Sequence, residues 1–204
     1  MRLGRVEATG GFFLLLAWLN YLDTQGLVPM AMAACALHEL GHFLTLRRLG
    51  GRVRLIRLTA AGAEMVLSRP LGYWQEGLTA LAGPGVNLLL ALLFCAWPGG
   101  TVFAGLNLVL ACFNMLPVGR LDGGRALYCT LALLAGPGWA GRVGRSMDLA
   151  GAALLLAGGV LSLGAGGNIT LLLVALWLLA ALFSQNNWGR NRNRACHRGG
   201  KQVK

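Results

Sequence analysis

Hydrophobic residues along this chain gather into long runs, separated by short segments rich in glycine or charge. Each run is about as long as a helix must be to cross ~30 Å of hydrocarbon. Glycine-containing turns are expected at Gly26, at 98–100 and at 164–167. The pattern predicts an all-α polytopic membrane protein with about six transmembrane helices, at residues 6–22, 27–46, 77–97, 101–118, 149–166 and 168–184.

The segment between the second and third runs has a different pattern. Val53 and Leu55 alternate with Arg52 and Arg54, and a glycine-containing centre leads into the apolar residues 65–67. Alternation with period two around such a centre is typical of a hairpin. We therefore expect a short interfacial β-hairpin between the second and third transmembrane helices.

Two further segments are assigned to the inner surface. Residues 126–136 are apolar, but the run is short and begins beside Arg125, and a seventh span here would move basic segments to the opposite side. We predict a helix on the inner surface instead. Residues 185–204 are polar, basic and glycine-rich, which favours a disordered cytoplasmic tail near anionic lipid. Residues 1–184 are expected to form one membrane-embedded domain.

The charge distribution supports this layout. Only 12% of residues are charged, against about 25% in soluble domains, and mean hydropathy is +0.61. With both termini in the cytoplasm, the inner segments 1–5, 47–76, 119–148 and 185–204 hold all 18 Lys and Arg. This is the asymmetry of a multi-pass cell-membrane protein. The basic residues form no aromatic-interleaved patch, so the net charge of +11 indicates a membrane surface and no nucleic acid.

Five cysteines stand at positions 35, 95, 112, 129 and 196, with no Cys-x-x-Cys pair. Four of them lie in apolar runs, so we expect buried small side chains and no disulfide framework. The first apolar run follows a basic start, as in a secretory signal, but lacks small residues at a cleavage position. It is predicted to be a retained span.

The second run contains the sequence His38-Glu39-Leu40-Gly41-His42. On a helix, the spacing of four residues places both imidazoles on one face, where they can reach one metal ion. Zinc favours two such histidines, a third protein ligand and an open position for water. Glu39 points off that face and can act as a general base toward that water.

The alternative is a coincidence, with two histidines packed between helices. Only three histidines exist in the chain, and two of them stand here with a glutamate inside a predicted span. An ionisable group in a membrane helix costs a few kcal/mol on insertion scales and generally marks function. Metal binding is therefore favoured.

The motif does not identify the third metal ligand. The candidates on the inner side are Glu64, Glu76, Asp122, Asp148 and His197. Asp122 differs from the others because it follows a span directly, where Asn114 and Pro117 break the helix and a pair of glycines follows. Its alternative role is a helix cap or a partner for Arg120 or Arg125. Cys35 lies one turn before His38, but a fourth ligand would close the site, so packing is favoured.

The combined motifs resemble those of the site-2 protease family of intramembrane zinc metalloproteases. HELGH in a span is followed by Gly-Pro-x-x-Asn at 83–87 and by Asn-x-x-Pro-x-x-x-Leu-Asp-Gly-Gly-Arg at 114–125. The resemblance covers the catalytic core at about 30–130, and is greatest to the stage IV sporulation protease branch. Arg120 stands where many members of that branch have proline, and Thr59–Met65 replaces the usual hairpin turn.

The resemblance implies a role for each matching residue. His38, His42 and Asp122 would bind Zn²⁺, Glu39 would be the catalytic base, and Asn114 would contact substrate. For Asn87 we favour helix packing, with Gly83 and Gly85 allowing close approach. The expected function is cleavage of a membrane-anchored protein near the cytoplasmic face, as in activation of a sporulation factor.

Two other classes of protein are also considered. A zinc transporter or sensor would need the histidines but not Glu39 beside them. A silent scaffold would be expected to have lost a ligand or the base. The chain keeps all four groups, so an enzyme is favoured, whereas its substrate and oligomeric state are not indicated.

Overall fold

The computed structural model describes residues 2–3, 6–59, 62–119, 121–164, 166, 172–173 and 176. The chain divides after Met115 into two compact units. Within the described residues, unit 1 contains four strands and the first four helices, and unit 2 contains two helices. Each unit is described by itself.

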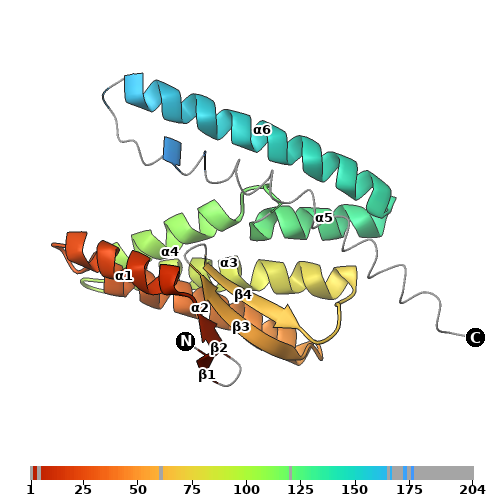
Figure 1. Ribbon diagram of the computed structural model, residues 1–204, viewed down its shortest axis with the longest axis horizontal. Helices are drawn as coiled ribbons and strands as arrows, with labels where there is room; N and C mark the ends of the chain where they lie inside the picture. The colour runs from red at the N-terminus through yellow and green to blue at the C-terminus, as the bar shows by residue number, and fades with distance from the viewer. Residues whose placement is uncertain are drawn as a thin grey trace, which may run out of the picture. The chain divides into compact units, whose positions relative to one another are not determined.

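Three helices form the core of unit 1: α2 (Leu27–Arg48), α3 (Tyr73–Cys95) and α4 (Thr101–Asn114). Each of them packs against the other two (Figure 1). Small residues at the contacts let the backbones approach closely, as is common between membrane helices. The buried ones include Ala34, Ala80, Ala104 and Ala111.

The predicted hairpin is present between α2 and α3. Its strands are β3 (Val53–Thr59) and β4 (Gly62–Leu67), which pair antiparallel. They belong to a four-stranded sheet of order β1-β2-β3-β4, in which β1 (Arg2–Leu3) and β2 (Val6–Ala8) come from the N-terminal segment. β2 runs parallel to β3 (Figure 1).

The first predicted span, residues 6–22, starts too early. Residues 6–8 are a strand, and helix α1 (Gly10–Leu22) begins only after it. The physical reason lies in the sheet: Glu7 pairs with Arg57 of β3 at 3.3 Å, and the backbone N–H of Thr9 donates to the carbonyl of Leu58. These contacts hold the segment in an extended conformation.

The prediction of six transmembrane helices is not confirmed. Among the described residues, three helices are long and apolar enough to cross a membrane: α2, α3 and α6. α1 and α4 are apolar but have 13 and 14 residues, which span only about 20 Å at 1.5 Å per residue. α4 ends at Asn114, four residues before the predicted end of that span at 118 and within the stretch where a helix break was expected. The sixth run, 168–184, lies almost entirely outside the described residues.

Unit 2 contains α5 (Asp122–Ala135) and α6 (Pro137–Gly164), which turns back along α5 after Gly136 (Figure 1). α5 accounts for the helix predicted over 126–136. α6 starts 12 residues before the predicted span at 149, because Pro137 suits the first position of a helix and no further proline interrupts the polar turns that follow.

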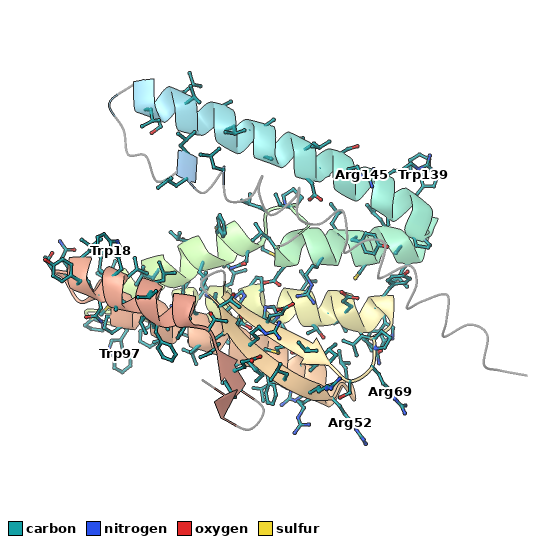
Figure 2. All side chains as sticks on the ribbon, in the orientation of Figure 1. Trp18, Arg52, Arg69, Trp97, Trp139 and Arg145 are labelled. Carbon is teal, nitrogen blue, oxygen red and sulfur yellow. The ribbon has the colours of Figure 1, made fainter. Side chains whose placement is uncertain are left out.

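The two ends of unit 1 differ in chemistry. Figure 2 shows Trp18 and Trp97 at one end and Arg52 and Arg69 at the other. Both tryptophans are more than half exposed, at 62% and 69%. Tryptophan is enriched at membrane interfaces and arginine at the cytoplasmic one, so this polarity fits a unit that crosses the bilayer.

The prediction of buried cysteines is right only for Cys129. Cys35, Cys95 and Cys112 are exposed on the surfaces of their helices, and all four are free thiols. In a membrane, lipid would cover such apolar helix faces and keep these thiols from water without any protein contact. Cys196 lies outside the described residues.

Candidate metal centre

Helix α2 carries both histidines of the HELGH motif on its buried face. His38 and His42 are 5% and 7% exposed, and their rings meet edge to face with 4.7 Å between the centroids. The two Nε2 atoms are 3.0 Å apart. The predicted one-face arrangement of the imidazoles is therefore present.

Helix α3 supplies an oxygen to the far nitrogen of each ring. His42 Nδ1 lies 2.7 Å from the backbone carbonyl oxygen of Thr79, and His38 Nδ1 lies 3.1 Å from Oδ1 of Asn87. Both oxygens accept hydrogen bonds, so each Nδ1 carries the ring proton. The Nε2 lone pair of each neutral ring is then directed at the other ring.

Two lone pairs this close repel each other unless a proton or a metal ion lies between them. Nitrogen ligands at 2.0–2.1 Å from a tetrahedral zinc ion are roughly 3.3 Å apart, close to the separation of the two Nε2 atoms. Histidine ligands of zinc also generally donate the other ring N–H to a carbonyl or carboxylate. The arrangement of His38 and His42 thus fits zinc.

Two glycines make room for the imidazoles between the helices. A Cβ built on Gly83 of α3 would collide with His42 Nε2 and lie 2.7 Å from His38 Nε2. A Cβ on Gly41 of α2 would lie 2.8 Å from Val86 Cγ2 and 2.9 Å from the carbonyl oxygen of Ala82. Gly83 and Gly41 therefore permit the close approach of α2 and α3. Gly85 was predicted to act similarly, but a Cβ built on it would meet no described atom within 4 Å.

Glu39 lies between the two histidines on α2 and is half-buried. A neighbour in sequence on a helix is rotated by about 100° from the ligand face, which leaves its carboxylate beside that face. Cys35 is exposed and is not grouped with the histidines in the described structure.

Asp122 is the first residue of α5 in unit 2 and is 6% exposed. Its Oδ1 is 3.5 Å from Nη1 of Arg125, the contact expected if Asp122 were only a charge partner. A carboxylate can accept from arginine and still offer its other oxygen. The ligation of zinc by Asp122 remains a prediction.

The other residues singled out by the sequence have separate positions. Asn114 is the last residue of α4, where its Nδ2 donates to the carbonyl of Leu110 at 3.0 Å. Glu64 lies on β4 near Arg57, and Glu76 lies in the first turn of α3. His197 is outside the described residues. A role for Asn114 toward substrate remains a prediction.

The oxygen partners of the imidazoles were not identified from the sequence. Thr79 acts through its backbone carbonyl, which leaves no trace in residue type. Asn87 was assigned to packing, and it does bridge two helices, but its partner is a histidine of the motif. The Gly-Pro-x-x-Asn spacing was the available signal, since it places Gly83 and Asn87 one turn apart on α3.

No protein-family model matches the chain. Relatives among curated sequences include the protein named putative zinc metalloprotease Rip3 of Mycobacterium tuberculosis. It is 32% identical over 201 residues, covering 84% of this chain and 48% of Rip3. A zinc metalloprotease of Methanocaldococcus jannaschii is 27% identical over 164 residues, covering 73% of this chain and 46% of that protein. The chain thus spans about half the length of these relatives.

Among solved structures, the site-2 protease from Methanocaldococcus jannaschii superposes with a TM-score of 0.66. The match covers 90% of this chain and 92% of that protein, at 23% sequence identity. The chain has the fold of that protease. The names of these relatives do not mention sporulation. The chain is thus similar in sequence to proteins named as zinc metalloproteases and similar in fold to a site-2 protease, and His38 and His42 suit zinc as the metal.

Proposed function

We propose that this protein is an intramembrane zinc metalloendopeptidase that cleaves a membrane-anchored protein. The observation that carries the proposal is the paired histidine arrangement: two buried Nε2 atoms 3.0 Å apart, each ring oriented by an oxygen of α3. The metalloprotease names of the sequence relatives support the same function.

In this proposal His38, His42 and Asp122 hold the zinc, and Glu39 is the general base. Zinc, when bound, lowers the pKa of a water and polarises the peptide carbonyl to be cleaved. Glu39 takes a proton from the water while the oxygen of that water bonds to the carbonyl carbon. It then passes that proton to the amine as the C–N bond breaks, which leaves a carboxylic acid and an amine.

The site is proposed to lie below the cytoplasmic surface of the membrane. α2 ends in Arg47 and Arg48, so His42 is about 9 Å and His38 about 15 Å from that end by helix rise. Basic residues favour the cytoplasmic side. We accordingly propose a multi-pass protein with both termini in the cytoplasm, and water access to Glu39 from that side.

Strand β4 is the proposed docking edge for substrate. A substrate helix must unwind before cleavage because its carbonyls are engaged in intrahelical hydrogen bonds. Within the described sheet, β2 covers one edge of β3, while β4 pairs only with β3. An extended substrate segment can add to the outer edge of β4.

The docking step is tested with proline substitutions at Met65 and Val66. Neighbouring residues of a strand direct their N–H groups to opposite sides, so one substitution removes an outward donor and the other a donor to β3. We expect the substitution that removes the outward N–H donor to abolish cleavage while the protein still folds. Full cleavage after replacement of the whole hairpin by a flexible linker would exclude the docking role.

The resemblance to the sporulation branch leads us to propose an anchored transcription-factor precursor as the first substrate to examine. The chemistry of the site does not distinguish it from an anti-sigma factor or a leftover signal peptide. Substrate choice is therefore left to direct measurement in the host membrane.

The decisive experiment compares host membranes that contain the native protein with those that contain Glu39→Gln. Mass spectrometry should find one or a few membrane-anchored proteins that accumulate uncut in the variant. The purified Glu39→Gln protein should still bind one zinc per chain, whereas His38→Ala and His42→Ala should not.

Other outcomes identify the alternatives. Zinc transport that persists in Glu39→Gln would indicate a transporter or sensor, because transport does not need the base. Zinc binding with no uncut protein under several growth conditions would indicate a scaffold. A native protein without zinc would contradict the proposed function as a whole.

A further inference from the structure

An aspartate on α6 contacts the turn that leads into Asp122. Asp148 Oδ1 accepts a hydrogen bond from the backbone N–H of Gly119, and the carboxylate is half-buried. The sequence suggested a charge at a helix boundary for Asp148. It lies instead inside α6, 12 residues into the helix.

The turn between α4 and α5 is compact. The backbone N–H of Val118 donates to the carbonyl of Leu116, and that of Leu121 donates to the carbonyl of Val118, both at 2.8 Å. A Cβ on Gly124 would collide with the backbone of Val118 and lie 2.6 Å from the N of Gly119. The turn therefore folds directly onto the first turn of α5, where Asp122 lies.

α6 holds this turn at two neighbouring points on one face. Val118 is almost fully buried, and a Cβ on Gly151 would lie 3.0 Å from its Cγ2. Positions 148 and 151 are three residues apart, so they share a face of the helix. Asp148 provides the polar contact of this face, and Gly151 provides the space for Val118.

Burying part of a carboxylate costs free energy unless it is hydrogen-bonded. The backbone N–H groups of a buried turn also need partners within the protein. Asp148 meets the second need by accepting from Gly119, three residues before Asp122.

We propose that Asp148 is a positioning residue, which fixes the Val118–Leu121 turn and thereby the carboxylate of Asp122 for metal binding. This inference rests on the proposed function, because it assumes that Asp122 is the third zinc ligand. Asp148 itself is not proposed to touch zinc or substrate.

The test uses Asp148→Leu, which removes the acceptor, and Asp148→Asn, which keeps an acceptor oxygen without the charge. Ser146→Leu is the matched control, since Ser146 is exposed on the same helix and its hydroxyl donates to the carbonyl of Arg142. Gly119→Ala perturbs the contact from the other side, because its Cβ would lie 3.0 Å from Asp148 Oδ2.

Two readouts are measured on the full-length protein in detergent. Hydrogen exchange of a peptide that covers residues 116–121 reports the turn in the metal-free protein. Zinc affinity, by competition with a chromophoric chelator, reports the ligand. Asp148→Leu and Gly119→Ala should exchange faster and bind zinc about 10-fold or more weakly, the usual effect of losing an outer-shell contact. Asp148→Asn and Ser146→Leu should remain within about threefold of native affinity.

The outcomes separate this inference from the proposed function. If hydrogen exchange of residues 116–121 is unchanged in a folded Asp148→Leu protein, Asp148 does not fix the turn, whatever the zinc result. Faster exchange together with native zinc affinity would show that Asp148 fixes the turn but does not position Asp122. This result would also overturn the proposal. A native protein that binds no zinc would remove the proposed function and this role with it, while the exchange result still reports the contact with Gly119.

Discussion

The imidazole of His38 meets the side-chain amide of Asn87 across the interface of α2 and α3, with 3.1 Å between Nδ1 and Oδ1. Asn87 is completely buried. The contact joins the HELGH motif to the Gly-Pro-x-x-Asn motif and determines which nitrogen of His38 faces its neighbour.

Replacing Asn87 with alanine should weaken zinc binding 10- to 100-fold, because His38 Nδ1–H loses its acceptor and the ring its orientation. Asn87→Asp, which keeps an oxygen, should bind more tightly than Asn87→Ala. Asn107→Ala is the control: Asn107 is equally buried on α4, but its Nδ2 donates to the carbonyl of Phe103. Equal zinc affinities for the two alanine variants, measured by chelator competition, would contradict the role of Asn87.

Gly83→Ala should abolish zinc binding, because the new methyl group would occupy the space against both Nε2 atoms. Gly85→Ala, two residues along the same helix, should bind zinc normally since its Cβ meets no described atom within 4 Å. Metal content after dialysis distinguishes the two. A zinc-replete Gly83→Ala protein would show that the ion lies elsewhere.

Gly41→Ala should lower stability by about 1–3 kcal/mol, the range for overpacking a close contact. Its Cβ would press on Val86 and on the carbonyl of Ala82, so α2 and α3 must separate. Gly105→Ala on α4, whose Cβ is in open space, should be neutral or slightly stabilising. Thermal unfolding in detergent compares them; the same midpoint for both variants would argue against the close packing at Gly41.

Asp23 should make the stability of the start of α2 dependent on pH. Its carboxylate accepts from the backbone N–H of Val28 at 2.8 Å, Leu27 at 3.0 Å and Gln25 at 3.2 Å. These bonds, the one from Val28 above all, hold the pKa of Asp23 below its usual value. The stabilisation is therefore present above the pKa of the unfolded chain and is lost as pH falls through the lower pKa of the folded state.

Asp23→Ala should thus unfold at a lower temperature than the native protein at pH 7. The difference between the two unfolding midpoints should become smaller as the pH falls into the acid range. Asp23→Asn keeps a capping oxygen but does not titrate, so its effect should vary less with pH. Thermal unfolding in detergent between pH 7 and pH 3 measures both. A gap for Asp23→Ala that is constant over this range would mean that the carboxylate charge contributes nothing.

The sequence was sufficient wherever a local rule decides the structure. Four-residue spacing predicted the shared face of His38 and His42, alternation predicted the hairpin, and Pro117 predicted the end of α4 near Asn114. Each of these depends on residues within a few positions of one another.

Pairings between distant segments were not predictable in this way. Strand β2 has three residues and takes its conformation from β3, about 50 residues further on. Val6 and Ala8 are apolar and precede a long apolar run, so the segment looked like the start of a helix. Asp148 likewise gives no local sign that its partner is the backbone of Gly119, because a peptide N–H is the same in every residue except proline.

The pairing of α2 with α3 has a consequence for biosynthesis. Both imidazoles and both of their oxygen partners lie within residues 38–87, so two consecutive helices contain this half of the centre. A growing chain that has released α3 from the ribosome already holds every group needed to bring the two rings together. The order of synthesis thus makes the histidine pair the earliest part of the centre to form, whereas Asp122, the predicted third ligand, is synthesised only after α4 and its turn.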